Sequence, residues 1–478
     1  MGKKYRFLIG ILLILLVSGV GYGVYKWYSE KQSITKIPQQ IEQVNEDLRK
    51  VEMAYELILS KYVEGVEEAT LVEGAIQGML KTLDDPYSVY MDAQTAAQFN
   101  DSLDSSFEGI GAEVTEVDGK IKIVAPFKNS PAEKAGLKPN DEIMKVDGES
   151  LEGKDVYEAT LKIRGKEGTT VRLEIKREGL VDPIEVSVQR AEIPNESVHY
   201  GMKGDSRQPI GYVEITSFSE NTAEEFQQAL TDLEEEALTG LIIDVRGNPG
   251  GLLKAVEQIS AQLVAGEKPY FQIQERSGEK RPYYSPLKKK KPYPIAVLID
   301  EGSASASEIL AGALSEAGQY PLIGVKTFGK GTVQQAIPLG DGSNIKMTTF
   351  KWLTPDGNWI HRKGIQPTIE VEQPSFFHTH PLQIEQPLKV EMNDEAVKRA
   401  QEMLYGLGYG PGRTDGYFSM QTEKAVKAFQ VTNSLAVTGV IDKKTANKLE
   451  EVIQQETELE KNDIQLQAAI HYLSAQDE

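Results

Sequence analysis

The sequence predicts an α/β protein of several domains: a membrane anchor, a helical region, a small partly open β-barrel, an α/β core and a three-helix unit. Three observations predict this fold class. The 478 residues are too many for one core. Near-continuous apolar strands alternate with helices from about residue 210 to 371, as in a sheet covered on both faces. Strands of alternating polarity fill about residues 107–193, as in half-buried sheets.

The N-terminal segment predicts the compartment. Basic residues precede an uncharged, mostly apolar run from Phe7 to Tyr25. About nineteen residues in a helix span roughly 28 Å, close to the thickness of the hydrocarbon core. The basic flank stays in the cytoplasm, which places the remainder outside. Because no A-x-A site follows the run, we expect an uncleaved anchor over residues 1–30, with a cleaved signal and secretion as the alternative.

Composition excludes several classes of function. Lys plus Arg is 52 and Asp plus Glu is 72, which gives a net charge of −20 and disfavours nucleic-acid binding. The chain has no cysteine, so disulfides, Cys-ligated zinc and thiol catalysis are excluded.

Residues 31–104 have a helical pattern, with apolar side chains three and four apart in Val51, Tyr55 and Ile58 and a second helix over Leu71–Leu80. Pro86 breaks this pattern. The β-rich region spans residues 105–192, where strands interrupted by two short helices predict the small partly open barrel.

The α/β core is expected over residues 193–373, with part of 63–104. Its helices are predicted at Thr222–Glu236 and Leu252–Val264, and Arg276–Pro294 is predicted to be a solvated connection. A linker rich in Pro, His and Gln leads to a compact three-helix unit over residues 390–452. The charged tail, residues 453–478, is expected to be helical, and the sequence leaves open whether it packs on this chain or on another.

A serine-rich segment, GSASASEILAGAL (Gly302–Leu314), lies between a buried strand and a helix. A serine at such a turn can point its hydroxyl outward, and the helix N-terminus supplies backbone N–H groups for a developing oxyanion. Serine is also a common helix cap, and Ser305 with Glu308 three residues on fits a capping box. Taken alone, this segment is compatible with either role.

A lysine between two glycines is the second candidate. Lys330 stands between Gly329 and Gly331, and small neighbours let its stem enter a narrow site. A lysine acts as a general base only when neutral, so burial must lower its pKa. Gln334 lies four residues on, and residues i and i+4 of a strand share a face, so its amide can hold the amine without adding charge. The alternative for Lys330 is a solvated turn lysine.

A third segment, LIIDVRGNPGGLLKAV (Leu241–Val256), opens from a buried strand into a glycine-rich loop and then a helix. Such a loop exposes backbone N–H groups, as an oxyanion hole requires. Neither GxGxxG nor GxxxxGK[ST] is present, so nucleotide binding has little support.

Four segments in this order resemble the carboxyl-terminal processing (tail-specific) family of serine proteases: IGYVEITSFS, DVRGNPGGLL, GSASASEI and GKGTVQQ. The resemblance covers roughly Val63 to Val371. It implies that the central serine of S-A-S-A-S is the nucleophile and that the base lysine stands 25 positions later, which assigns Ser305 and Lys330. It also implies that Gln334 orients the lysine and that the amides of Gly251 and Ala306 form the oxyanion hole. DVRGNPGG differs slightly from the commoner DLRxNPGG of the family.

The β-rich region resembles the PDZ domain that this family carries. Gly109, Ile110, Gly111 and Ala112 fit the loop whose amides bind a substrate's terminal carboxylate, and the following strand offers an edge for an extended peptide. The glycines alone would also fit a simple tight turn. Arg164, at the end of the expected groove helix, is a candidate for coupling the PDZ domain to the active site; a solvated charge is the alternative.

The three-helix unit resembles the small peptidoglycan-binding fold, from KRAQEMLYGLGYGPGRTDGYF onward. Together, the resemblances imply a Ser–Lys endopeptidase that needs no metal or cofactor and recognises apolar C-terminal tails of proteins outside the cell, in envelope quality control or sporulation signalling. They also suggest a homodimer. Two alternatives remain: a peptide-binding scaffold with an inactive core, and a Ser–His–Asp hydrolase that uses His361.

Overall fold

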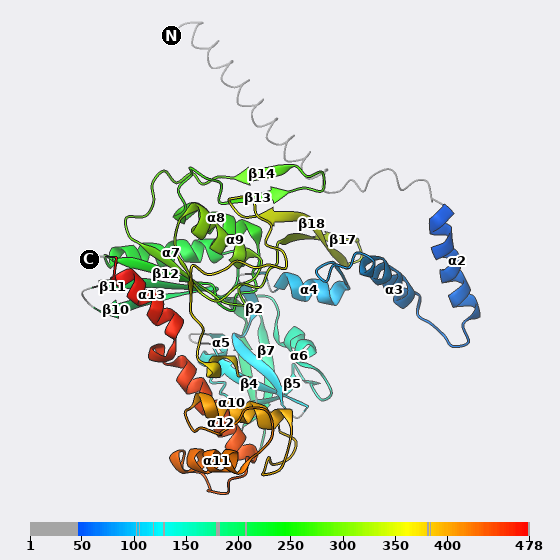
Figure 1. The fold of residues 1–478 in the computed structure, drawn as a ribbon. Coiled ribbons are helices and arrows are strands. Elements are labelled where there is room, and N and C mark those ends of the chain that lie inside the picture. The colour runs from blue at the N-terminus through cyan, green and yellow to red at the C-terminus, as the bar shows by residue number, and fades with distance from the viewer. Residues whose placement is uncertain are drawn as a thin grey trace, which may run out of the picture. The chain divides into compact units, whose positions relative to one another are not determined.

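The computed structural model describes residues 46–101, 103–104, 106–117, 119–127, 130–177, 182–205, 208–379, 382 and 384–476 (Figure 1). The anchor predicted over residues 1–30 lies outside them. None of the described helices is both long enough and apolar enough to cross a bilayer. The chain divides into two compact units, one ending at Asp85 and the other beginning at Pro86.

The first unit contains helices α2 (Glu46–Lys61) and α3 (Glu68–Lys81) (Figure 1). An apolar hollow of about 750 Å³ lies between them. Its walls include Val51, Ile58 and Met79, which are 48%, 39% and 56% exposed. The 3.6-residue spacing that predicted two helices has therefore placed an apolar stripe on each, but within this unit the stripes stay partly in contact with solvent.

The second unit begins with strand β1 (Val89–Met91) and helix α4 (Ala93–Asp101). A small β-barrel follows, whose sheet has the order β3-β4-β5-β7-β8, with β6 paired to β5. Its elements are β3 (Ala112–Val117), β4 (Lys120–Pro126), α5 (Pro131–Lys134), β5 (Glu142–Val146), β6 (Glu149–Ser150), α6 (Val156–Ile163), β7 (Thr170–Lys176) and β8 (Ile184–Gln189). Alternating residues of β7 are fully buried, as the polarity pattern predicted.

The chain enters and leaves the barrel through one two-stranded ribbon. Strand β2 (Ser106–Gly109) pairs antiparallel with β9 (Ala191–Pro194), so that Ser106 is opposite Pro194. The two ends of the barrel domain are therefore held side by side.

The core contains a six-stranded sheet of order β10-β11-β12-β15-β16-β19 (Figure 1). Only β10 (Val198–Asp205) and β11 (Gln208–Ile215) pair antiparallel. The parallel strands are β12 (Gly240–Asp244), β15 (Ile295–Ile299), β16 (Leu322–Gly324) and β19 (Ile369–Glu370). All residues of β12 and β15 are buried, because helices cover both faces of these strands.

One face of this sheet packs against α7 (Thr222–Glu235), α8 (Leu253–Leu263) and α9 (Ala306–Gly312). The other face packs against the C-terminal helix α13 (Ile464–Ser474) through Leu466, Ala469 and Leu473. The sequence left the packing of this tail open; here it completes the core of its own chain (Figure 1).

A second, antiparallel sheet has the order β1-β18-β13-β14, with β17 on the other edge of β18. Its strands besides β1 are β13 (Phe271–Gln274), β14 (Lys280–Tyr283), β17 (Thr332–Pro338) and β18 (Asn344–Leu353). Arg276–Pro294 was predicted to be a solvated connection; residues 280–282 are indeed exposed, but they belong to strand β14 and not to a loop. Tyr283 stacks on Phe271 with ring centroids 4.7 Å apart, and Pro282 is tolerated because β14 is an edge strand.

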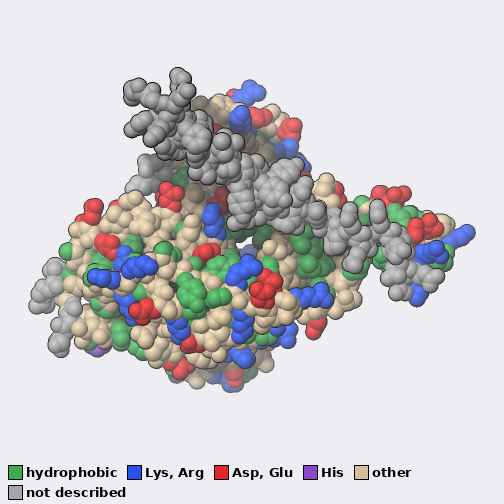
Figure 2. Space-filling model, turned by 90° about the horizontal axis from the view of Figure 1, so that it is seen from above, with side chains coloured by type: hydrophobic (Ala, Val, Ile, Leu, Met, Phe, Trp, Pro, Cys, Tyr) green, Lys and Arg blue, Asp and Glu red, His purple; other side chains and the backbone are tan. Residues whose placement is uncertain are grey.

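The C-terminal unit consists of α10 (Glu395–Gly406), α11 (Met420–Thr432) and α12 (Lys443–Glu458) around a core of its own. A short helix, η3 (Ser375–His378), precedes it, and η4 (Glu460–Asn462) joins it to α13. On the face shown in Figure 2, acidic and basic side chains are interspersed with neutral ones.

Candidate active site

Ser305 lies at the turn between β15 and α9 in a strained backbone conformation. Its φ and ψ are 56° and −109°, a region that non-glycine residues rarely adopt. The strain persists because the flanking residues are fixed: the N–H of Ala304 and the hydroxyl of Ser307 both donate to the Asn248 carbonyl, at 3.0 and 2.8 Å. Such over-determined strain is typical of functional sites.

The glycine loop approaches Ser305 closely. A Cβ on Gly250 would lie 2.9 Å from the Ser305 Cβ, and a Cβ on Gly251 only 2.1 Å from the Phe218 carbonyl oxygen. Both glycines also have positive φ, of 106° and 147°. The backbone can come this near only because these two residues have no side chain.

Asn248 holds the loop from inside. Its buried amide donates to the Ile215 carbonyl at 2.7 Å, and its Oδ1 accepts the Gly250 N–H at 2.8 Å. Within the described part of the chain, the N–H groups of Gly251 and Ala306 contact no acceptor. The two amides predicted for an oxyanion hole are therefore available to an anionic oxygen.

Lys330 lies on a turn built by close contacts. A Cβ on Gly331 would lie 2.7 Å from the backbone nitrogen of His361. Trp352 Nε1 donates to the Lys330 carbonyl at 2.8 Å. The Lys330 Nζ lies 4.8 Å from the centre of the Tyr87 ring, a cation–π contact made by the charged form of the amine.

Glu308 connects the serine and lysine segments and is the residue whose part in the site the sequence did not reveal. Its side chain is fully buried. Oε2 accepts the N–H groups of Ser305 and Lys330, at 3.0 and 2.8 Å. Oε1 accepts the Thr327 hydroxyl at 2.6 Å and the Gly329 N–H at 2.7 Å. The capping-box spacing was the available signal, but it predicted only the bond to Ser305.

Gln334 bonds to threonine side chains. Its Nε2 donates to the hydroxyls of Thr332 and Thr348, each at 3.0 Å. The argument that Lys330 and Gln334 share one face of a strand does not apply here, because Lys330 precedes β17, which begins at Thr332. Within the described residues, no hydrogen bond joins Lys330 to the Ser305 hydroxyl or to Gln334.

His361 lies beside the lysine turn. Its Nδ1 accepts the Gly331 N–H at 3.3 Å, and its ring stacks on Trp359 with centroids 5.2 Å apart. These contacts favour a structural role for the ring.

The four residues expected to bind a terminal carboxylate join β2 to β3. Ile110 is buried, and Gly111 has φ +71°, where a Cβ would lie 2.6 Å from the Ser130 Cβ. The N–H groups of Ile110 and Gly111 contact no acceptor among the described residues. Gly109 ends β2 and Ala112 begins β3, which places both at the edges of this loop.

Arg164 ends the helix α6. It forms an ion pair with Asp101, the last residue of α4, and its guanidinium lies 4.7 Å from the centre of the Phe107 ring. This partly exposed ion pair joins the barrel to α4, the helix that follows β1, and both roles expected for Arg164 stay predictions.

Chemically, the site presents a serine on a strained turn, a lysine turn fastened to the same buried carboxylate, and two N–H groups available to an oxyanion. This set supports nucleophilic acyl transfer.

Comparison with known proteins gives the same picture. Family models match in four places: Peptidase family S41 at residues 209–371, a PDZ domain at 109–188, a peptidoglycan binding domain at 393–449 and the Activating protease CtpB N-terminal domain at 14–95.

The carboxy-terminal processing protease CtpB of Bacillus subtilis (strain 168) is 56% identical over 95% of this chain and 96% of its own. The carboxy-terminal processing protease CtpA of the same organism is 44% identical, over 89% and 90%. The solved photosystem II D1 C-terminal processing protease is 26% identical, over 69% of this chain and 94% of its own, with a TM-score of 0.42, and the assignment does not depend on it. The chain therefore belongs to the carboxy-terminal processing serine proteases of peptidase family S41.

Proposed function

We propose that the chain is a Ser–Lys endopeptidase that binds the C-terminal tails of protein substrates through its PDZ domain and cleaves the chain presented to its core. The observation that carries the proposal is the buried Glu308 carboxylate, which accepts the backbone N–H groups of both Ser305 and Lys330. This carboxylate holds the segment of the proposed nucleophile and the segment of the proposed base next to each other.

In the proposed reaction, neutral Lys330 takes the proton of the Ser305 hydroxyl, and the oxygen attacks the scissile carbonyl. The amides of Gly251 and Ala306 stabilise the oxyanion of the tetrahedral intermediate. Its collapse releases the amine with a proton from Lys330, and water then hydrolyses the acyl-enzyme. Gln334 orients the amine in this step, for which it must exchange its bonds to Thr332 and Thr348.

Alignment of the site then becomes the regulated step. Lys330 must leave the face of the Tyr87 ring before it can reach Ser305 as a neutral amine. The Arg164–Asp101 ion pair joins the end of the groove helix α6 to α4, which follows β1. Because β1 pairs with β18 and β18 with β17, a tail bound to the PDZ domain can act on the strand that carries Gln334.

We also propose a location and partners for the protease. The apolar run Phe7–Tyr25 anchors it in the membrane with the catalytic part outside, and the C-terminal unit binds peptidoglycan. A second copy covers the apolar side chains of α2 and α3, which gives a homodimer. Substrates are misfolded envelope proteins with apolar tails or one dedicated substrate in sporulation signalling.

The test is cleavage of β-casein by the full-length chain. Ser305→Ala and Lys330→Ala should each lower kcat about a thousandfold or more, since loss of a nucleophile or its base removes the covalent route. Ser277→Ala and Lys289→Ala, at exposed surface positions, are the matched controls.

Three results would contradict the assignment. Cleavage retained by either active-site variant would remove the Ser–Lys pair. A wild-type protein that binds tail peptides without cleaving any would be a scaffold. Loss of cleavage on replacing His361 but not Lys330 would point to a Ser–His hydrolase.

A further inference from the structure

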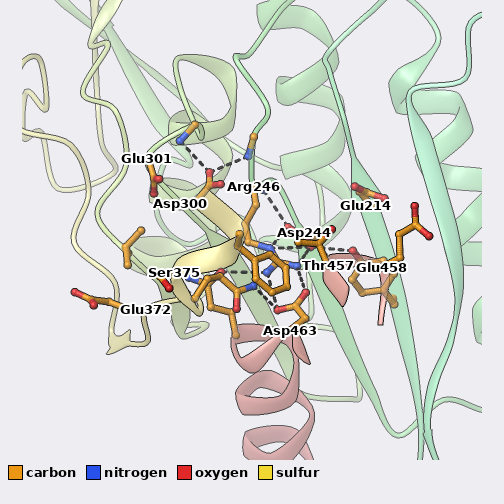
Figure 3. Close-up of a pocket in the computed structure, with 17 residues that line it drawn as sticks. Glu214, Asp244, Arg246, Asp300, Glu301, Glu372, Ser375, Thr457, Glu458 and Asp463 are labelled. Carbon is orange, nitrogen blue, oxygen red and sulfur yellow. Dashed lines mark hydrogen bonds and ion pairs between the residues drawn. The ribbon is translucent and has the colours of Figure 1, made fainter. Parts of the chain in front are cut away.

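Arg246 lies at the start of the glycine loop, two residues beyond the end of β12, and is held by two carboxylates (Figure 3). Its Nε donates to both Asp244 oxygens at 3.0 Å. Its Nη1 and Nη2 donate to Oδ1 and Oδ2 of Asp463 at 2.9 and 2.8 Å. This paired geometry fixes the direction of the guanidinium as well as its distance.

Asp463 belongs to a distant part of the sequence. It caps α13, where its Oδ1 accepts the Leu466 N–H at 2.9 Å. The same oxygen accepts Gln373 Nε2 at 2.6 Å, and the Ile464 N–H donates back to Gln373 Oε1 at 3.1 Å. The segment that leaves for the C-terminal unit and the segment that returns from it therefore meet at Arg246.

The contacts continue from Arg246 toward the reacting groups. The N–H of the next residue, Gly247, donates to Asp300 Oδ1 at 2.8 Å. That oxygen also accepts the N–H groups of Gly302 and Ser303, at 3.0 and 2.9 Å. One carboxylate thus joins the start of the glycine loop to the turn that carries Ser305.

A cavity of about 1250 Å³ surrounds this junction (Figure 3). Of the described residues that line it, Arg246 alone is cationic, while five further carboxylates share the wall: Glu214, Asp300, Glu301, Glu372 and Glu458. Burial acts to lower the pKa of Arg246, but Asp244 and Asp463 outweigh it and raise that pKa. An arginine released from Asp463 stays charged and keeps its hydrogen bonds to Asp244, but it loses two of its fixed partners and has competing carboxylates nearby. Asp463 therefore contributes to fixing the position of Arg246.

We propose that Asp463 is a positioning residue for proteolysis, which acts through Arg246 to hold the glycine loop that offers the Gly251 amide. Residues 463–474 are on this view part of the catalytic framework and not an accessory tail. The inference rests on the proposed function, because it needs the Gly251 amide to stabilise an oxyanion.

The test uses Asp463→Asn in the full-length chain with β-casein as substrate. Asparagine keeps the shape and the capping oxygen but removes the charge that pairs with Arg246. Because a small misplacement of a catalytic group costs up to about a hundredfold in rate, we expect kcat to fall about tenfold with KM unchanged. Glu460→Gln is the matched control: it breaks the 2.7 Å bridge to Lys203, which fastens the same C-terminal segment to β10, far in the chain from the glycine loop.

A second readout separates positioning from folding. Amide hydrogen exchange at residues 247–251 should be faster in Asp463→Asn than in wild type and unchanged in Glu460→Gln. Equal kcat and equal exchange in both variants would overturn the inference. If Asp463→Asn does not fold, Gln373→Ala weakens the same joint with both charges kept, and an unchanged kcat there would overturn it too.

The outcomes distinguish the two proposals. If wild type cleaves in a Ser305-dependent way while Asp463→Asn matches Glu460→Gln, only the positioning role fails. If cleavage does not depend on Ser305, the proposed function fails with it.

Discussion

Glu308 combines two roles in one side chain. As the third residue of α9 it accepts the Ser305 N–H, as in a capping box, and it also holds the turn that carries Lys330. Two of its four hydrogen bonds, from the Thr327 hydroxyl and the Gly329 N–H, come from buried groups, and the other two come from half-buried backbone. The serine and lysine backbones are therefore held together by their hydrogen bonds to one shared oxygen, Glu308 Oε2.

Replacing Glu308 should damage activity and stability together. In Glu308→Gln one oxygen becomes an NH₂ group that faces N–H donors, and each buried donor left unpaired costs about 1–3 kcal/mol. We expect a loss of about 2–4 kcal/mol in the free energy of unfolding and a fall in kcat of about a hundredfold. Denaturant unfolding and β-casein cleavage measure both.

Thr327 provides the matched pair for this experiment. Thr327→Ser keeps the hydroxyl that donates to Glu308, so its kcat and free energy of unfolding should be close to those of wild type. Thr327→Val removes the hydroxyl, and both quantities should lie between those of wild type and Glu308→Gln. A Glu308→Gln protein with wild-type kcat would show that the carboxylate only caps the helix.

Among individual residues, the sequence assigned roles to those in a motif and gave no signal for those whose partners are distant. Ser305 and Lys330 were placed by spacing within a family pattern. Asp463 was not, because nothing local marks its partner Arg246, which is 217 residues away. Gln334 shows a further limit: the same-face argument needs Lys330 on the same strand, but β17 begins only at Thr332, and strand boundaries are not predicted to the residue from alternation alone.

At the scale of elements, α13 is the helix whose position the sequence left open. Its hydrophobic residues pack on the face of the core sheet opposite to α7, α8 and α9. The strands of this sheet are apolar on both faces, so their sequence does not predict which helix covers which face. Strand β14 was missed for the opposite reason: its charged residues and proline resemble a loop, and its pairing with β13 has no signal in the local sequence.

Truncating the buried face of α13 tests its contribution. Leu466 is 4% exposed and packs against the core sheet, whereas Ile464, on the same helix, is 41% exposed. Leu466→Ala should lower the free energy of unfolding by about 2–5 kcal/mol through a lost side chain and a cavity. Ile464→Ala should cost less than about 1 kcal/mol. Equal small effects in denaturant unfolding would mean that α13 does not cover the sheet in solution.

At the scale of the whole molecule, the junction at Arg246 joins the core, the linker and the C-terminal helix by charge. Burial alone would raise the pKa of Asp463, but the hydrogen bonds and charge of Arg246 prevail and hold this pKa below its ordinary value of 3.8. A carboxyl with a lowered folded-state pKa stabilises the fold above its unfolded pKa, and this contribution is lost as pH falls through the folded value.

The difference in the free energy of unfolding between wild type and Asp463→Asn should therefore be largest near pH 6 and shrink below about pH 4. Reversible unfolding monitored by fluorescence at several pH values measures it. Glu460→Gln serves again as the comparison, and a difference that stays constant from pH 6 to pH 3 would exclude a titrating Asp463–Arg246 link.

The proposed dimer depends on the apolar hollow of the N-terminal unit. Introducing Val51→Glu and Met79→Glu together should convert the dimer to a monomer, because two charges would be buried without partners. Met53→Glu, at a position 66% exposed and outside the hollow, should leave the dimer intact. Light scattering of the full-length protein in detergent measures the mass, and a monomeric wild type would exclude this interface.

The hydrogen bonds between Gln373 and the Asp463–Ile464 pair also have an evolutionary consequence. Because the chain departs and returns at one point, the three-helix unit is an insert with adjacent ends. Such a module can be exchanged for another with equally close termini without rebuilding the host fold. Replacement of this one module can thus change what the C-terminal unit binds, while the protease core is inherited unchanged.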